Sequence, residues 1–219
     1  MLGGAGAGGD RVPPMSARIV VLVSGSGSNM AALVDACEAG RVPGRVVAVA
    51  ADRPCRALEF AAARRIPSVQ VDFGAYPDRE SWSATLRDEV AAHDPGLVVS
   101  AGFMRILSPV FVDAFSGRLI NLHPALLPAF PGPRAVKDAL AFGVKVTGTT
   151  VHFVDYEVDH GPILLQEAVP IEAGDTEQSL HERIKAVERR LLPEACKLIL
   201  EGRVRIERHL TFVDARMRG

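Results

Sequence analysis

The sequence predicts an α/β protein with a doubly wound, Rossmann-like and mostly parallel sheet, and with antiparallel strands in its C-terminal half. Over the first hundred residues, apolar β-branched runs alternate with amphipathic segments, as in βαβ units. Hydrophobic residues make up 48% of the chain but aromatic residues only 5%, which is typical of the aliphatic core of a helix-covered parallel sheet. In the second half, two apolar runs follow each other without a helical segment between them, which indicates an antiparallel pair.

Four strands and three helices are predicted in the first half. The run Arg18–Ser24 is apolar and β-branched until it meets glycines, which is typical of a buried strand. The third helix carries Trp82, Leu86 and Val90 on one side, at helical spacing. In chain order, the strands are expected at 18–24, 45–51, 67–73 and 97–101, and the helices at 29–37, 55–64 and 78–92.

The second half is predicted to contain three strands and two helices. Its first strand leads into a proline-rich loop, and its short helix ends at Gly143. Asp175, with Gln178 three residues later, predicts a capping box at the start of the final helix, which Pro193 is expected to kink or restart. The strands are expected at 119–123, 146–154 and 163–171, the short helix at 135–142, and the end of the final helix at Gly202.

Composition narrows the class of protein. The formal net charge of −1 gives no sign of binding to nucleic acid or to a membrane surface, and no apolar run reaches the roughly 18 residues of a spanning helix. Three scattered cysteines without a CxxC pair argue against a disulfide framework and a zinc knuckle. The Gly- and Ala-rich start does not resemble a secretory signal, so we expect a cytoplasmic protein. A single domain is expected at 18–208, between a flexible N-terminal tail at 1–17 and a C-terminal tail at 209–219.

The segment Ser24–Asn29, SGSGSN, follows the first predicted strand and opens the first predicted helix. Glycines at such a turn let backbone N–H groups point at an anion, and the start of the helix adds a favourable dipole. A dinucleotide site is disfavoured because Met30 occupies the third glycine position, and the Lys of a phosphate-binding P-loop is missing. Two interpretations remain open: a purely structural turn, or a cradle for a single phosphate built from Gly27, Ser28 and Asn29.

A second candidate site lies at the strand that carries Asn121 and His123. The two residues are two positions apart, so their side chains face the same way on an extended chain, at the end of the sheet where α/β proteins bind ligands. A satisfied buried histidine is the alternative. The prolines that follow restrict the backbone more than a simple connection requires, which favours a functional site. These prolines are Pro124, Pro128, Pro131 and Pro133.

A third constellation of polar residues lies between Val151 and Pro162. Its spacing matches no common zinc or iron ligand pattern, and a solvated acidic loop is the alternative to a functional site. The sequence gives no indication of a bound metal. The polar residues, which the sequence places in one loop, are His152, Asp155, Glu157, Asp159 and His160.

Five stretches of the chain combine into a resemblance. They are SGSGSN from Ser24, AGFMRILSP from Ala101, NLHPALLPAFPG from Asn121, VTGTTVHFVDYEVDHGPILLQ from Val146, and KAVE from Lys185. In this order they resemble the phosphoribosylglycinamide formyltransferase family of purine biosynthesis, from about Arg18 to Arg208. The resemblance implies a formyltransferase fold whose residues 18–105 mainly bind the nucleotide and its phosphate, and whose residues 106–208 bind folate and carry out catalysis.

The resemblance implies transfer of a formyl group from 10-formyltetrahydrofolate to the glycine amine of glycinamide ribonucleotide. Negative charge develops on the attacked carbonyl, and preorganised donors stabilise it. Family members supply these donors at the positions of Asn121 and His123. By the same resemblance, Asp159 raises the pKa of His123, favours its charged form, and holds a water that carries the proton to the departing folate nitrogen.

The binding residues follow from the resemblance one position at a time. Arg79 matches a folate-contacting arginine that can pair with a glutamate-tail carboxylate, and its alternative is a solvated helix charge. The ribonucleotide is expected at Gly27, Ser28, Asn29, Lys185, Ala186, Val187 and Glu188. Folate is expected at Arg79, Met104, Arg105, Ile106, Leu107, Asn121, Asp155, Tyr156, Glu157, Val158 and Asp159.

One position departs from the family pattern, because Arg134 stands where members commonly have a histidine. Two related activities share the same chemistry: methionyl-tRNA formyltransferase, for which we would expect a further RNA-binding domain, and formyltetrahydrofolate deformylase, for which we would expect an N-terminal regulatory domain. A folate- or nucleotide-sensing module is the non-enzymatic alternative. The expected partners are small molecules, with no nucleic acid and no membrane, and a homodimer is possible.

Overall fold

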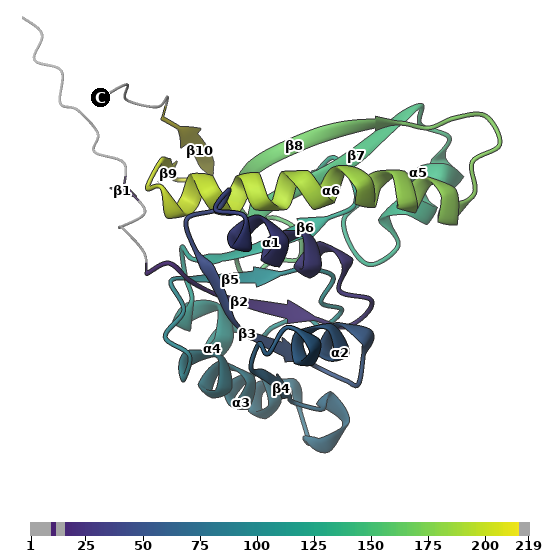
Figure 1. The fold of residues 1–219 in the computed structure, drawn as a ribbon. Coiled ribbons are helices and arrows are strands. Elements are labelled where there is room, and N and C mark those ends of the chain that lie inside the picture. Colours follow the sequence, from purple (N-terminus) through teal and green to yellow (C-terminus); the bar gives the residue numbers. More distant parts are fainter. Residues whose placement is uncertain (1–9, 12–15, 215–219) are drawn as a thin grey trace, which may run out of the picture.

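The structure, a computed structural model, describes residues 10–11 and 16–214 (Figure 1). Its centre is a seven-stranded sheet with the order β4-β3-β2-β5-β6-β7-β8. The first five of these strands run parallel, whereas β7 runs antiparallel to β6 and β8 antiparallel to β7, which confirms the predicted fold class. The strands are β2 (Arg18–Val23), β3 (Arg45–Ala51), β4 (Ser68–Gln70), β5 (Leu97–Ser100), β6 (Leu119–His123), β7 (Val146–Phe153) and β8 (Ile163–Pro170).

Helices cover both faces of the sheet, with α1 and α6 on one face and α3 and α4 on the other (Figure 1). Neighbouring strand residues point to opposite faces, so each strand contributes side chains to the hydrophobic core on both faces of the sheet. In β2, Val21 packs with the α1 and α6 side, whereas Val20 and Leu22 pack with the α3 and α4 side, and all three are fully buried. The helices are α1 (Ser28–Glu38), α2 (Arg56–Ala63), α3 (Arg79–Ala91), α4 (Pro109–Ala114), α5 (Ala135–Phe142) and α6 (Glu177–Leu200).

The strand order reverses between β2 and β5, because chain order runs outward from β2 to β4 on one side and from β5 to β6 on the other. Loops that leave the carboxyl ends of two such strands separate and open a crevice, which is where α/β sheets bind ligands. The loops that begin at Ser24 and Ala101 therefore flank the crevice, and the carboxyl end of β6, with His123, lies beside them.

Two elements of the first half differ from the prediction. Strand β4 ends at Gln70 rather than at Phe73, because the Asp72 side chain accepts a hydrogen bond from the Gly74 N–H and starts a 3₁₀ turn at Phe73–Ala75. Helix α4 was not predicted. It is only six residues long and begins at Pro109, so its apolar residues are too few to give a helical period.

The start and the interior of α6 also differ from the prediction. The capping box consists of Thr176 and Ser179, not of Asp175 and Gln178. Asp175 instead accepts hydrogen bonds from Ser179 Oγ and from the guanidinium of Arg183. The helix runs through Pro193 without a restart, since burial of Leu192, Pro193 and Ala195 offsets the single hydrogen bond that proline cannot donate.

The predicted C-terminal tail at 209–219 is wrong for residues 210–213. Strands β9 (Val204–Glu207) and β10 (Leu210–Val213) form a hairpin, and β1 (Asp10–Arg11), within the predicted N-terminal tail, pairs with β9 in the same small sheet. Each strand of this hairpin is only four residues long, so its pattern is too short to be a clear strand signal in the sequence. Residues 1–9, 12–15 and 215–219 lie outside the described part of the chain. Within 10–11 and 16–214, no helix is long and apolar enough to cross a membrane.

Candidate active site

A cavity of about 530 Å³ opens at the carboxyl edge of the sheet, a size typical of small-molecule sites. The loops after β2, β5 and β6 line it, together with the loop between β7 and β8 and one face of α6. Both halves of the chain therefore build the same cavity. Most of the predicted site residues lie around it.

The segment Ser24–Asn29, here called the glycine loop, forms one end of the cavity. Gly27, with φ at 74°, is the N-cap of α1, and a Cβ there would lie only 2.7 Å from the Cβ of Ala57. The residue must therefore be glycine both for its backbone conformation and for its contact with α2. Helix α1 has no side-chain cap, which leaves its first N–H groups available to an anion. Gly27, Ser28 and Asn29 all line the cavity.

Glu188 links the glycine loop to α6. Its Oε2 accepts a hydrogen bond of 2.8 Å from Asn29 Nδ2, and its Oε1 lies 3.5 Å from Thr149 Oγ1. Burial raises the pKa of Glu188 above its ordinary value, although Asn29 and the nearby Lys185 act in the opposite direction. A buried carboxylate with so few donors is suited to accept hydrogen bonds from a ligand.

Asn121, His123 and Asp159 meet at the centre of the cavity. Asn121 and His123 are alternate residues of β6, as predicted from their spacing. Asp159 arrives from the loop after β7, with its Oδ2 3.3 Å from His123 Nδ1 and its Oδ1 3.4 Å from Asn121 Nδ2. The His123 side chain is 5% exposed and that of Asp159 10%, so their charges interact in a partly dry environment.

The proline-rich loop after β6, here called the proline loop, contacts both His123 and Asp159 through its backbone. The Phe130 carbonyl lies 2.9 Å from His123 Nε2, and the Gly132 N–H donates a 2.7 Å hydrogen bond to Asp159 Oδ2. The loop itself is anchored on the sheet, since Leu127 N–H donates to Thr150 Oγ1 and its carbonyl accepts from Gln166 Nε2. The loop therefore fixes the imidazole and the carboxylate through its backbone.

The pKa of His123 differs from the sequence-based expectation. Burial lowers the pKa of His123 below its ordinary value, and this outweighs the opposite effect of Asp159 and of the Phe130 carbonyl. The hydrogen-bond geometry nevertheless suits the imidazolium, because both ring nitrogens face oxygen acceptors and a neutral ring could donate from only one. A bound substrate that adds negative charge would therefore favour protonation of a ring that is already held for it.

Asp159 is the anionic partner of this pair. Burial alone would raise the pKa of Asp159, but interactions with His152, the Gly132 N–H and His123 together hold it below its usual value. Asp159 is also a non-glycine residue with φ at 55°, a conformation that costs free energy and persists only where the surroundings impose it. The carboxylate is thus ionised and fixed in position.

His152 also lines the cavity, although the sequence did not assign it to the site. It lies on β7, within the strand predicted at 146–154 and not in the loop with which the sequence grouped it, and pairs directly with Asn121 in the antiparallel register. Its Nδ1 donates to the Phe153 carbonyl at 2.8 Å, and its Nε2 lies 3.2 Å from Asn121 Nδ2 and 3.6 Å from Asp159 Oδ1. This orients the Asn121 amide, and only the register between β6 and β7, which the sequence does not reveal, could have identified it.

A second unassigned group braces the segment after β5. Asp52, at the end of β3, is 1% exposed and accepts a 2.8 Å hydrogen bond from Arg105 Nε and a 2.9 Å one from Arg53 Nη2. Burial alone would raise the pKa of Asp52, but Arg53, Ser24 and Arg105 hold it below its usual value. Ser24 Oγ also accepts from the Met104 N–H at 2.9 Å. The glycine loop and the segment 104–107 are therefore connected.

The apolar walls of the cavity are unusually exposed. Met104 is 58% exposed and Ile106 54%, and across the cavity Tyr156 and Val158 are exposed as well. Large apolar side chains around one cavity mark a surface that a ligand covers. The remaining residues predicted to bind folate here, Arg105, Leu107, Asp155 and Glu157, also line the cavity.

Three predicted binding residues do not line the cavity: Arg79, Ala186 and Val187. On α6 the residues that face the cavity are His181, Lys185 and Glu188, which share one helical face, so the two residues between Lys185 and Glu188 point elsewhere. His181 was missed, although its spacing from Lys185 was a usable signal. Arg134 is also outside, 70% exposed and 3.9 Å from Asp138.

Comparisons with known proteins agree with this geometry. Residues 17–196 match the family model described as formyl transferase. A phosphoribosylglycinamide formyltransferase of Mycobacterium tuberculosis is 57% identical over 186 residues, which cover 84% of this chain and 86% of the relative. The crystal structure of glycinamide ribonucleotide transformylase 1 from Symbiobacterium toebii has a TM-score of 0.89 at 46% identity, and covers 92% of this chain and 95% of its own.

A neighbour with a different name shares the fold at lower identity. The crystal structure of a formyltetrahydrofolate deformylase from Pseudomonas syringae has a TM-score of 0.85 at 26% identity, and covers 93% of this chain but 67% of its own. An enzyme that moves a formyl group is the class of protein that this fold and this cavity define. The chain belongs to the phosphoribosylglycinamide formyltransferases, the formyl transferase family members of purine biosynthesis.

Proposed function

We propose that the protein transfers the formyl group of 10-formyltetrahydrofolate to the glycine amine of glycinamide ribonucleotide, giving the N-formyl product and tetrahydrofolate. The observation that carries the proposal is the meeting of Asn121, His123 and Asp159 in one cavity that also contains an uncapped helix start. The first group of residues suits acyl transfer, and the helix start suits a phosphate.

The catalytic steps follow from these side chains. The glycine amine attacks the formyl carbon, a C–N bond forms, and the carbonyl oxygen becomes an oxyanion. The amide of Asn121 donates a hydrogen bond to it, and the imidazolium of His123 supplies positive charge beside it. A water held by Asp159 takes the proton from the amine and delivers it to N10 of the folate as the C–N10 bond breaks, so atoms and charge balance.

Binding is assigned to the two ends of the cavity. The phosphate is expected on Gly27, Ser28 and Asn29, with Glu188 accepting hydrogen bonds from the ribonucleotide and Lys185 adding positive charge. The pterin ring is expected between the segment 104–107 and the loop 155–159, whose apolar side chains flank it. Arg79 lies outside the cavity, so any contact it makes is with the glutamate tail.

Rates with different formyl acceptors test the proposal. Formyl transfer from 10-formyltetrahydrofolate is measured with glycinamide ribonucleotide, with water alone, and with methionyl-tRNA. We expect a large rate enhancement with the ribonucleotide only. Formate release at the same rate without the ribonucleotide would identify a deformylase, transfer to the tRNA would identify the second rival, and binding of both ligands without turnover would identify a sensor.

A homodimer is proposed as well. The exposed side chains of Leu210, Phe212 and Val213 on β10 provide apolar surface that a second copy would cover. Sedimentation equilibrium should report a dimer at micromolar concentration, and Leu210→Asp should weaken it. A wild-type monomer at every concentration would contradict this assignment.

A cytoplasmic location is inferred from the substrates. A phosphorylated nucleotide and a polyanionic folate are retained inside cells by their charge, and the enzyme must meet both. Cell fractionation with detection of the native protein tests this inference, and recovery in a secreted fraction would contradict it.

A further inference from the structure

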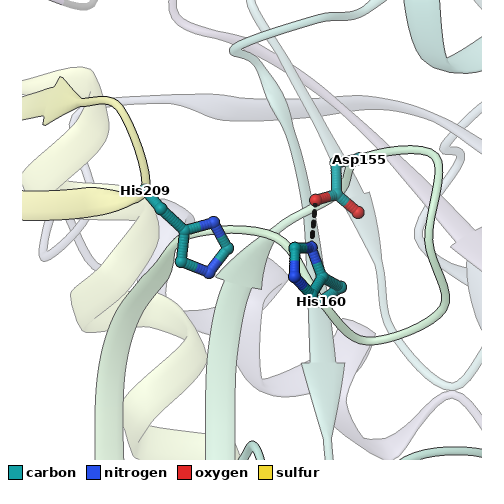
Figure 2. A group of neighbouring side chains, drawn as sticks. All are labelled: Asp155, His160 and His209. Carbon is teal, nitrogen blue, oxygen red and sulfur yellow. Dashed lines mark hydrogen bonds and ion pairs between the residues drawn. The ribbon is translucent and has the colours of Figure 1, made fainter.

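Two histidines and an aspartate gather beside the active-site loop (Figure 2). Asp155 and His160 come from the loop after β7, and His209 comes from the turn between β9 and β10. His160 Nδ1 lies 3.0 Å from Asp155 Oδ2, and one ligand atom from each of the three residues lies within 4.8 Å of the other two. The rings of His160 and His209 have their centroids 4.8 Å apart.

The backbone positions the β9–β10 turn, which carries His209, and the loop after β7, which carries Asp155 and His160. Arg208 adopts a φ of 58°, which turns the β9–β10 hairpin and presents His209. The Thr211 hydroxyl donates to the Ile163 carbonyl and ties this hairpin to the start of β8. After His160, Gly161 leaves no room for a Cβ, which would lie 2.0 Å from the Phe153 carbonyl, so the loop closes directly against β7.

The ligand set identifies the kind of ion. Imidazole nitrogens and a carboxylate oxygen are ligands that Zn²⁺ prefers, whereas Mg²⁺ and Ca²⁺ prefer oxygen alone. Ligand atoms about 2.1 Å from a tetrahedral ion lie roughly 3.4 Å from one another, so the ligand atoms of these three residues, which lie within 4.8 Å, need to approach by up to about 1.4 Å. The side chains of His160 and Asp155 are 55% and 32% exposed, so they can rotate at little cost.

We propose that Asp155, His160 and His209 bind one divalent cation of the zinc class, with a fourth position left to water. The sequence pattern that argued against a metal covered only residues 152–160, and the third ligand lies on the distant β9–β10 turn. The ion would tether the loop that carries Asp159 to this hairpin, because Asp155 and His160 lie on either side of Asp159. The metal site adjoins the proposed folate-binding loop, because Asp155 also lines the substrate cavity, but binding of the ion does not require formyl transfer.

Calorimetric titration of the chelator-treated full chain with Zn²⁺ tests the proposal. We expect one Zn²⁺ per chain, and no comparable heat with Mg²⁺. His209→Ala and His160→Ala should each weaken Zn²⁺ binding by at least about tenfold, since even the outer partners of a metal site are worth about 10–100-fold in affinity. His93→Ala is the matched control, because His93 follows α3 in another part of the molecule and should leave binding unchanged.

Thermal unfolding supplies a second readout that does not involve activity. Zn²⁺ well above its dissociation constant should raise the melting temperature of the wild type by on the order of 5 °C, and should not raise that of His209→Ala. Absence of binding, equal losses in His93→Ala, or binding that survives in His209→Ala would each overturn the site. The last result would place the ion elsewhere, for instance at the buried His123 and His152.

Discussion

Two loops at the carboxyl edge of the sheet, one rich in glycine and one rich in proline, differ in the groups that they present to the cavity. The loop after β2 uses glycines and leaves the N–H groups at the start of α1 uncapped, so it offers backbone groups and empty space. The loop after β6 uses prolines, and its backbone grips the side chains of His123 and Asp159. A site that binds a fixed anion needs room, whereas a site that stabilises developing charge needs donors that do not move.

The comparison predicts opposite sensitivities in the two loops. Substitutions that add atoms should impair the function of the glycine loop. Substitutions that remove functional groups should impair the function of His123 and Asp159, which the backbone of the proline loop contacts. The first effect should appear in ribonucleotide binding and the second in turnover.

His123→Ala should give the largest effect. In the proposed mechanism it removes the positive charge beside the oxyanion, so kcat should fall by at least about 10²-fold, the scale for loss of one oxyanion donor. Dissociation constants for both substrates should change little, because the interaction strengthens mainly as charge develops. Steady-state kinetics together with calorimetric binding measure both quantities, with His93→Ala as the control. A loss confined to substrate affinity would make His123 a binding residue, and the proline loop would then not differ from the glycine loop in serving turnover.

Asp159→Asn should give the next largest effect, with a signature in the pH profile. In the proposed mechanism the active form carries a protonated His123, so the rate should fall as pH rises through the pKa of His123. The Asp159 charge raises that pKa and burial lowers it, so removing the charge should lower the pKa further and move this limb of the kcat profile to lower pH. At a pH above the pKa, the imidazolium fraction falls about tenfold for each pH unit by which the limb moves.

The double variant His123→Ala, Asp159→Asn distinguishes a coupled pair from two independent residues. Residues that act as a unit are non-additive, so the double variant should be far less impaired than the product of the single losses. Full additivity, together with an unshifted pH profile in Asp159→Asn, would reduce Asp159 to an anchor for the Gly132 N–H.

In the loop Ser24–Asn29, substitutions of Gly25 and Gly27 distinguish a loss of room for the ligand from a loss of fold stability. A Cβ at Gly25 meets nothing within 4 Å, so Gly25→Ala should leave the melting temperature unchanged and weaken ribonucleotide binding by roughly tenfold. Gly27→Ala should destabilise the fold by about 1–3 kcal/mol, because of its positive φ and its clash with Ala57. Gly27→Val would therefore be a poor probe of phosphate approach. Equal losses of folate and ribonucleotide affinity in Gly25→Ala would show that the loop has no specific role.

The sequence predicted those parts of the molecule that depend on local pattern. The strand Arg45–Ala51 and the helix Ala135–Phe142 lie at their predicted bounds, and Asn121 and His123 share a strand face because strand alternation is local. The contact of His152 with Asn121 depends on the register between two strands, which no local pattern encodes. The net pKa direction of His123 was missed for a related reason, since burial comes from the whole fold.

The β9–β10 hairpin and the Asp52 brace were missed for different physical reasons. The two strands of the hairpin are only four residues each and lie on a half-exposed surface, so the hairpin gives a weak hydrophobic signal. Asp52 directly follows a strand, where an acidic residue is ordinarily solvated. Its burial depends on Arg53 and Arg105, and only the folded chain brings Arg105 close.

Asp52→Asn should give the smallest effect on kinetics. It tests the comparison most finely, because Asp52 positions its neighbours through a side chain, whereas the adjacent loop Ser24–Asn29 offers backbone groups. Its carboxylate holds Arg105, whose guanidinium also stacks 4.3 Å over the Phe73 ring, and thereby holds the segment 104–107. Arg105 is partly exposed, so loss of the charge should cost no more than roughly 1 kcal/mol, or about fivefold in KM for the folate, with kcat nearly unchanged. Asp88→Asn, which removes an exposed partner of Arg87, is the matched control and should leave KM unaltered. A fall in kcat without a change in folate KM would instead connect Asp52 to the chemistry, and the separation of the two loops would no longer hold.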